Sequence, residues 1–273
     1  MNSSPIRNNP LPKSSTLRAR QRLGKYRIEK KLSSGERASI YRAYDTIHAI
    51  PVALKVVTPE MASNACFLEE FTIEARLSTR MEHPNVLAIQ NASFVDDYFV
   101  IAMPLGIESL ADRITRRMST DLALNFTEQA IAAVAHAHRR KIIHCDIKPE
   151  NFIVFPDNRL KLSDFGFSKV AQPRLKASGS GTVGYVAPEQ AVGHPMFQSD
   201  VFSLSLLIYQ LFSGNLPEWP YSWPPAGIEK VRRKLRPKTR HWLRKGMAMR
   251  PQDRYRNAVA MENAFHKIPR PKR

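Results

Sequence analysis

The stretch from His144 to Asn151, which reads His-Cys-Asp-Ile-Lys-Pro-Glu-Asn, constrains this chain more than any other, together with Asp164 a short way downstream. Between them lie two short apolar-rich runs around a Pro-Asp-Asn turn. That pattern predicts a β-hairpin with a four-residue loop. If Phe155 pairs with Leu160, the next pair beyond the strands is Asn151 with Asp164. The hairpin would then bring an amide oxygen and a carboxylate to one place.

The chemistry of these two side chains indicates a metal and a phosphate. Oxygen ligands suit Mg²⁺, which takes few protein ligands and completes its shell with water and phosphate. Asp146 and Lys148 lie just upstream, on a loop beside the hairpin. A carboxylate, a cation and a metal pocket within one segment predict phosphoryl transfer.

The composition fits a globular protein of a reducing compartment. The hydrophobic content is 43% and the charged content 24%, both ordinary values. The two cysteines, Cys66 and Cys145, show no paired spacing, which argues against a disulfide framework or a zinc cluster. No signal-like run opens the chain, and the longest apolar stretch is too short to span a bilayer. We therefore expect a cytoplasmic protein without a transmembrane segment.

The chain is strongly basic, with a formal net charge of +18. Residues 229–256 alone carry twelve Lys and Arg against two acids. Such an excess predicts an anionic partner, such as an acidic protein, a nucleic acid or a membrane surface. The alternative is a basic surface that serves only solvation. The sequence does not indicate an oligomeric state.

The pattern along the chain predicts an α+β protein. Residues 1–22 hold five basic residues and no acid, and read as a disordered basic arm. Strands are predicted at residues 26–32, 40–44, 51–57, 86–95 and 98–103. Beyond residue 103 the apolar periodicity is mainly helical, notably over 121–139 and 200–212. We expect a small strand-rich part up to about residue 103, a larger helical part over 104–268, and a basic tail over 269–273.

One charge lies inside a predicted buried strand. Lys55 interrupts the apolar run of residues 51–57, and a buried charge is costly without a partner. Glu74 falls within the apolar stripe of the following predicted helix and could pair with it. The alternative is that Glu74 lies at the edge of that stripe and reaches solvent.

Together these residues resemble the eukaryotic-like Ser/Thr protein kinases, over residues 26–268. The resemblance implies a two-lobed kinase fold, with a small antiparallel β lobe that carries one key helix and a larger helical lobe. It also implies ATP and Mg²⁺ as cofactors and a protein substrate with Ser or Thr hydroxyls. Catalytic roles follow for Lys55, Glu74, Asp146, Lys148 and Thr182, and Mg²⁺ ligation for Asn151 and Asp164.

Within this resemblance each catalytic residue has an expected role. Asp146 would accept or orient the substrate hydroxyl proton, and Lys148 would neutralise charge on the phosphoryl group. Lys55 would hold the ATP phosphates with Glu74 as its partner, while Thr182 would help to seat the substrate. Nucleotide contacts are implied for Leu32, Gly35, Ile40, Ala53, Lys55, Ala102, Met103, Leu105 and Ile153.

The chain departs from the family pattern in its phosphate loop and at Cys145. Only Gly35 remains of the three glycines in the phosphate loop. Cys145 replaces the arginine that reads a phosphate on the activation loop, so we expect activity to depend little on phosphorylation there. The alternative is a degenerate kinase that serves as an ATP-binding or protein-binding scaffold and associates with nucleic acid through its basic surface. The resemblance also implies two structural contacts, a Glu189–Arg254 pair and an Asp200 that braces the catalytic loop.

Overall fold

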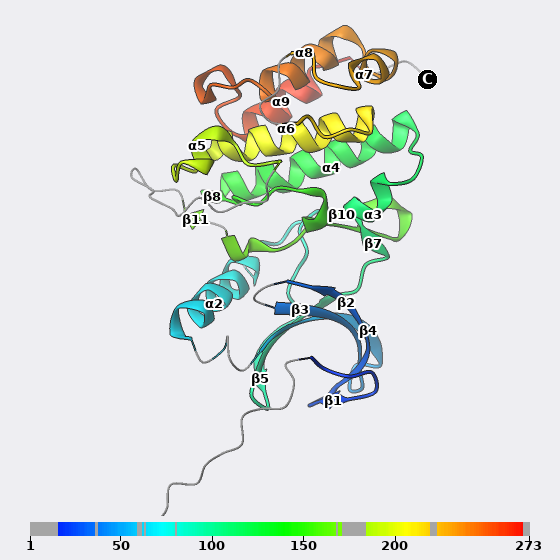
Figure 1. Ribbon diagram of the computed structural model, residues 1–273, viewed down its shortest axis with the longest axis vertical. Coiled ribbons are helices and arrows are strands. Elements are labelled where there is room, and N and C mark those ends of the chain that lie inside the picture. The colour runs from blue at the N-terminus through cyan, green and yellow to red at the C-terminus, as the bar shows by residue number, and fades with distance from the viewer. Residues whose placement is uncertain are drawn as a thin grey trace, which may run out of the picture. The chain divides into compact units, whose positions relative to one another are not determined.

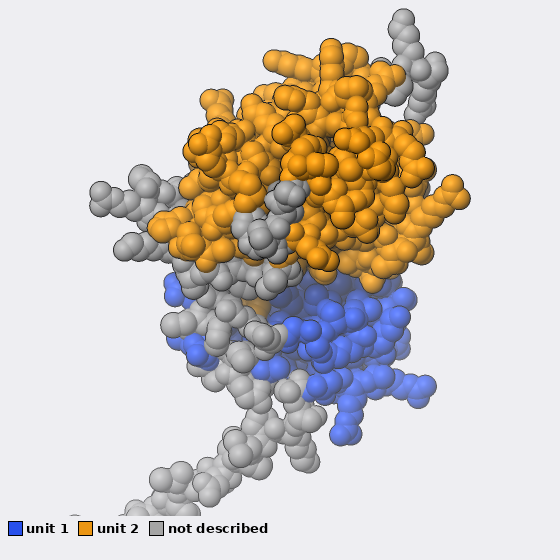
Figure 2. Space-filling view, turned by 45° about the horizontal axis from the view of Figure 1, so that its top comes forward, with its two compact units in different colours: residues 1–69, 89–105 blue, residues 70–88, 106–273 orange. Residues whose placement is uncertain are grey.

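The computed structural model describes residues 16–35, 38–58, 62, 64–79, 81–167, 169–170, 184–218 and 223–269. The chain divides into two compact units, which Figure 2 shows in different colours. Unit 1 comprises residues 1–69 and 89–105, and unit 2 comprises residues 70–88 and 106–273. Unit 1 is built around a sheet and unit 2 mainly from helices, which confirms the predicted α+β class.

Unit 1 holds a six-stranded antiparallel sheet in the order β1-β2-β3-β4-β6-β5, and the sheet is strongly curved (Figure 1). Its strands are β1 (Arg22–Leu23), β2 (Tyr26–Ser34), β3 (Ala38–Asp45), β4 (Ile50–Val57), β5 (Asn91–Val95) and β6 (Tyr98–Pro104). Strands β1 to β4 pair consecutively, β5 pairs with β6, and β6 also pairs with β4.

Side chains alternate across this sheet and so sort its residues into two faces. Val52, Leu54 and Val56 of β4 lie on the face that packs into the hydrophobic core of unit 1. Ala53 and Lys55 therefore lie on the opposite face. Lys55 is only 8% exposed, which confirms that this cation is buried in its strand.

The predicted strand over 86–95 forms only in its second half, as β5. Val86 instead makes an isolated parallel bridge to Leu162, which ends strand β10 (Arg159–Leu162). The Leu87 N–H donates to the Leu162 carbonyl at 2.8 Å, and the Leu162 N–H donates to the Asn85 carbonyl at 2.8 Å. Because these backbone groups are bonded to unit 2, the segment cannot extend β5.

The α-helices of the described chain are α2 (Ala65–Thr79), α3 (Leu110–Ile114), α4 (Thr120–Arg139), α5 (Pro188–Ala191), α6 (Phe197–Ser213), α7 (Ile228–Lys234), α8 (Pro237–Gly246) and α9 (Ala258–His266). Short 3₁₀ turns are η1 (Pro149–Asn151), η2 (Pro156–Asn158), η3 (Phe165–Phe167) and η4 (Pro251–Asp253). Unit 2 also holds two small sheets, one of β7 (Glu108–Ser109), β9 (Phe152–Phe155) and β10, and one of β8 (Ile142–Ile143) with β11 (Lys169–Val170).

Helix α6 is the centre of unit 2. It contacts α4, α7, α8 and α9, and Figure 1 shows it running between them. Most of its side chains are buried, which confirms the apolar-all-round pattern of residues 200–212. It ends at Gly214, whose left-handed φ of 77° suits the residue after a helix. Among the described helices, none is both long and apolar enough to cross a bilayer.

The predicted hairpin of β9 and β10 is present, but its register was wrong by one residue. Phe155 pairs with Arg159, not with Leu160. The loop has three residues instead of four, because Asp157 and Asn158 take positive φ values of 61° and 55° and close the turn early. The strand beyond the turn therefore begins at Arg159.

Two histidines of unit 2 stack on each other. The rings of His83 and His136 have centroids 4.6 Å apart. His136 is 7% exposed, and its Nε2 has no hydrogen-bond partner among the described residues. Burial, reinforced by the Arg140 charge, lowers the pKa of His136 to about 4, and burial also lowers the pKa of His83.

We predict an acid-sensitive stability from His136. Between pH 6.5 and about 4 the unfolded chain binds a proton at this residue that the folded chain does not. The free energy of unfolding should therefore fall as the pH drops through this window, by up to about 1.4 kcal/mol per pH unit from this residue. His136→Gln should flatten the slope in urea unfolding curves, whereas His241→Gln, at an exposed site, should not. An equal slope in both variants would contradict the assignment.

Candidate active site

Three of the predicted site residues, Asp146, Lys148 and Asn151, come together on the loop between β8 and β9. Asp146 is 5% exposed, and its Oδ2 lies 2.8 Å from the Lys148 Nζ. The Asn151 side-chain amide donates to the same Oδ2 at 2.9 Å and to the Asp146 carbonyl at 2.8 Å. The carboxylate is thus held in one orientation by a cation and an amide.

A second carboxylate, Asp200 of α6, holds this loop from below. Its Oδ2 accepts the His144 N–H at 2.7 Å, and its Oδ1 accepts the Cys145 N–H at 2.9 Å. The His138 Nε2 lies 2.9 Å from Oδ2. Since His138 Nδ1 accepts the Ala258 N–H, its Nε2 carries the proton and donates to Asp200. The brace that the resemblance implied is confirmed.

His138 is a positioning residue that the sequence reasoning missed. Its partner Asp200 lies 62 residues away in the chain. One feature of the sequence could have indicated this role: His138 lies near the end of a predicted helix that leads directly into the His144 loop.

The backbone of the site is strained at two positions. Cys145 has a φ of 67° and Asp164 a φ of 60°, values that residues with a Cβ rarely adopt. Such a conformation persists only where the surroundings impose it. At Cys145 the surroundings are the Asp200 carboxylate on its N–H and the Gln190 amide, which donates to its carbonyl at 2.5 Å.

His144 connects the catalytic loop to the segment that carries Asp164. It is fully buried, and its Nδ1 accepts the Asp146 N–H at 3.3 Å. Its Nε2 therefore donates to the Ser163 carbonyl, 3.1 Å away. Its ring also meets the Phe165 ring edge-on, with centroids 4.8 Å apart. Asp164 is thus held through the residues on either side of it.

The two predicted metal ligands offer oxygen atoms. Both donor contacts of the Asn151 amide go to Asp146, which leaves its Oδ1 as the atom that can face a cation. Ser163 N–H donates to the Asn151 carbonyl at 2.8 Å, so Asn151 lies opposite Ser163 and one position from Asp164. An amide oxygen and a carboxylate near the open end of the hairpin fit Mg²⁺.

The activation segment is anchored by an ion pair in unit 2. Arg254 is 4% exposed, and its Nη1 lies 2.7 Å from Glu189 Oε1. Ser199 donates to the same oxygen at 2.6 Å. The Glu189–Arg254 pair that the resemblance implied is therefore confirmed.

In unit 1 the sheet register brings several predicted nucleotide contacts to one face. Lys55 pairs with Ile40 on one side, and Ala53 pairs with Met103 on the other. Cross-strand partners share a face, so these four side chains lie on the side away from the core. Ala102 pairs with Leu54 and packs in the core, 2% exposed. Its predicted contact with the nucleotide therefore stays a prediction.

The other predicted contacts lie at the edges of their units. Leu32 is the extra residue of a β-bulge in β2 and is 45% exposed. The Gly35 N–H donates to the Ala38 carbonyl at 2.9 Å and closes a turn. Leu105 follows β6 and is half-buried, as is Ile153 of β9. The side chain of Glu74 lies outside the part of the chain that the structure describes. The same is true of Thr182 as a whole.

Three comparisons place the chain among known proteins. The protein kinase domain family matches residues 26–245. The crystal structure of the PknI kinase domain of Mycobacterium tuberculosis superposes with a TM-score of 0.68 at 25% identity, over 92% of this chain and 99% of that one. The fold is therefore that of a protein kinase, as predicted.

Curated relatives agree with this assignment. The chain is 31% identical to serine/threonine-protein kinase PrkC of Bacillus subtilis, over 71% of this chain and 31% of that protein. It is 30% identical to serine/threonine-protein kinase PknA of Mycobacterium tuberculosis, over 91% of this chain and 63% of that protein. It thus spans less than two thirds of the length of these relatives. The chain belongs to the protein kinase family, among its eukaryotic-like Ser/Thr members.

We predict that Asp200→Asn destabilises unit 2. The asparagine side chain has an NH₂ group in place of one carboxylate oxygen. At least one buried N–H that now donates to Asp200 would therefore lose its acceptor. The expected loss in the free energy of unfolding is about 2–4 kcal/mol, measured by urea denaturation.

Asp157→Asn is the matched control for this variant. Asp157 is exposed in the hairpin turn at a positive φ that asparagine tolerates, so its replacement should leave stability nearly unchanged. Equal stability of the Asp200→Asn variant and this control would refute the bracing role.

Proposed function

We propose that this chain transfers the γ-phosphate of ATP to Ser or Thr hydroxyls of a protein substrate. The observation that carries the proposal is the buried Asp146 carboxylate, held by the Lys148 Nζ at 2.8 Å and the Asn151 amide at 2.9 Å. A fixed carboxylate beside a lysine is what the alignment of a hydroxyl for phosphoryl transfer requires. The relatives' identity as Ser/Thr kinases supports the same reaction.

Each residue of the loop has one task in this proposal. Asp146 accepts or orients the proton of the attacking hydroxyl. Lys148 places a positive charge where negative charge accumulates on the transferred group. Asn151 stays fixed because its amide is bonded to Asp146, so its oxygen keeps one direction.

The proposed cofactors are ATP and Mg²⁺. Asn151 and Asp164 would hold the ion, which when bound neutralises charge on the phosphates. Lys55 would contact the phosphates from β4, with Glu74 as its proposed partner. Ala53, Ile40 and Met103 would line the same face of the sheet toward the base and sugar, and Leu32, Gly35, Ala102, Leu105 and Ile153 keep their proposed nucleotide contacts. Thr182 keeps its proposed role beside the substrate.

The alternative is a scaffold that binds ATP or protein without transfer. The single glycine of the loop before Ala38 motivates it, since glycines let a backbone approach phosphates closely. The chain keeps Lys55, Asp146, Asn151 and Asp164, and this favours an active enzyme over a scaffold. A scaffold that only binds does not require the Asp146 carboxylate, so replacing this side chain distinguishes the two proposals.

We predict that Asp146→Asn lowers transfer of radiolabelled γ-phosphate by about 10²–10⁴-fold, the usual contribution of a general base. The assay uses the chain itself, an acidic protein and a basic protein as acceptors. Lys148 and Asn151 can keep their contacts to the new amide oxygen, so folding should be retained.

Asp157→Asn again serves as the control, because it makes the same chemical change at an exposed turn. It should keep full activity. Equal transfer by Asp146→Asn and this control would remove the enzyme proposal and leave the scaffold.

We also propose that activity depends little on phosphorylation of the activation loop. Cys145 stands where the family has its phosphate-reading arginine; it is 2% exposed, and its thiol lies 3.7 Å from the Ile143 carbonyl. A buried thiol lacks the guanidinium group that makes charge-assisted hydrogen bonds to a phosphate. The loop hydroxyls, among them Ser178 and Ser180, lie outside the described residues.

The double variant Ser178→Ala/Ser180→Ala should therefore keep activity within about threefold of the wild type, far less than the effect of losing a charge-assisted contact network. Kinetics of γ-phosphate transfer after phosphatase treatment give the same comparison without mutation. Loss of nearly all activity in either experiment would show that another residue reads the phosphate.

The partners and location remain part of the proposal. Exposed cations of α7 and α8, among them Arg232, Arg233, Lys238 and Arg244, form a basic surface suited to an acidic protein or a nucleic acid. Nucleic-acid binding would weaken steeply with added salt. If the chain bound neither DNA nor RNA at moderate salt, a nucleic-acid partner would be excluded. A cytoplasmic location accords with the absence of a spanning helix among the described residues.

A further inference from the structure

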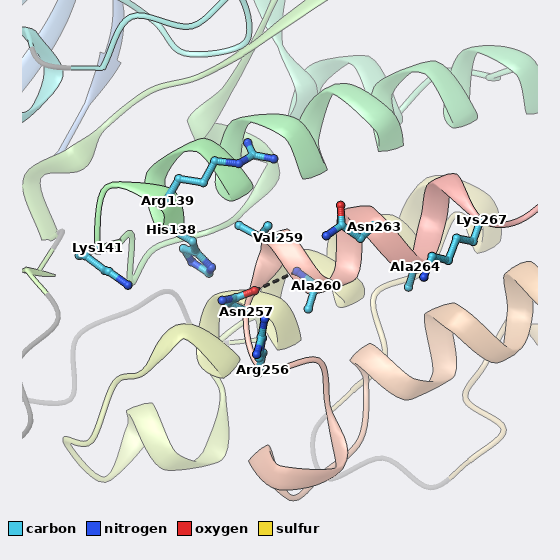
Figure 3. A pocket seen from close by; sticks show the side chains of 10 residues that line it. All are labelled: His138, Arg139, Lys141, Arg256, Asn257, Val259, Ala260, Asn263, Ala264 and Lys267. Atoms are coloured by element: carbon cyan, nitrogen blue, oxygen red, sulfur yellow. Dashed lines mark hydrogen bonds between the residues drawn. The ribbon is translucent and has the colours of Figure 1, made fainter.

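A cavity of about 460 Å³ lies in unit 2 between the end of α4 and the helix α9 (Figure 3). Its size falls within the range of small-molecule sites. Arg139 and Lys141 line it from α4 and the turn after it, and Arg256 and Lys267 line it from the two ends of α9. None of these residues belongs to the site proposed for catalysis.

The lining is positively charged and contains no acid. Four of its ten residues are Lys or Arg, and none is Asp or Glu. Arg139 pairs with Glu262, a neighbour outside the lining. Among the described residues, no carboxylate lies within ion-pair distance of Lys141, Arg256 or Lys267. Like charges gathered around a hollow repel each other, and an anion inside it relieves that repulsion.

The remaining polar groups of the cavity also favour an anion. Asn257 uses its Oδ1 to accept the Ala260 N–H, so its NH₂ is the part that can meet a ligand. Asn263 adds a second exposed amide to the lining. His138 contributes no nitrogen, because both are bonded to Ala258 and Asp200. Since Asn257 already caps α9, the cations and amides supply the binding groups, not the helix end.

We propose that this cavity binds a small molecule that carries two or more phosphate groups. Figure 3 shows Lys141 and Lys267 at opposite ends of the cavity, with Arg139 and Arg256 between them. This spacing suits an extended anion with charge along its length more than a single phosphate. Guanidinium groups can grip phosphate through two parallel hydrogen bonds, and the lysines add point charges.

Calorimetric titration with inorganic tripolyphosphate tests the proposal. The full chain carries Lys55→Met and Mg²⁺ is omitted, so that the proposed ATP site contributes little. We expect one saturable site. Arg256→Gln/Lys267→Gln should weaken it at least tenfold, because two charge-assisted contacts to the anion are lost.

Lys30→Gln/Arg117→Gln is the matched control, since it removes the same charge from exposed positions in β2 and between α3 and α4. It should leave the affinity within about twofold, as surface charges at a distance contribute little. Unchanged melting curves by circular dichroism would show that both double variants fold. Absence of saturable binding, or equal weakening by the two double variants, would overturn the proposal, because either result means only diffuse attraction to a basic surface.

Discussion

The Asp200 carboxylate is the constraint on which the catalytic loop depends. It is 1% exposed and accepts hydrogen bonds from the backbone of His144 and Cys145 and from the His138 ring. A buried charge is costly unless donors surround it, and here the donors are the loop itself. These hydrogen bonds can therefore hold the Cys145 backbone at its positive φ. Asp146 follows directly after this fixed residue.

The same network of hydrogen bonds continues from the catalytic loop to the hairpin of β9 and β10. His144 accepts from Asp146 on one nitrogen and donates to the Ser163 carbonyl from the other, so one buried ring fixes two segments. Asn151 begins the hairpin and bonds back to Asp146. The side chains that meet substrate and metal in the proposed reaction are thus linked by hydrogen bonds, and Cys145 stands in this loop where the family has its phosphate-reading arginine.

Local patterns predicted what depends on neighbours in the chain, and missed what depends on distant ones. The apolar run around Lys55 and the turn after Phe155 were sufficient for the strand and the hairpin. The hairpin register was wrong by one residue because two positive φ values shorten the turn, and no residue type demands them. His138 could not be matched with Asp200 from spacing alone.

The most direct test of the account is a crystal structure of the chain with a non-hydrolysable ATP analogue and Mn²⁺, which takes the same oxygen ligands as Mg²⁺ and has an anomalous signal. The account predicts an ion about 2.1 Å from the Asn151 Oδ1 and from the Asp164 carboxylate, in contact with the analogue's phosphates. An ion bound away from both residues, or a nucleotide whose metal touches neither, would contradict it.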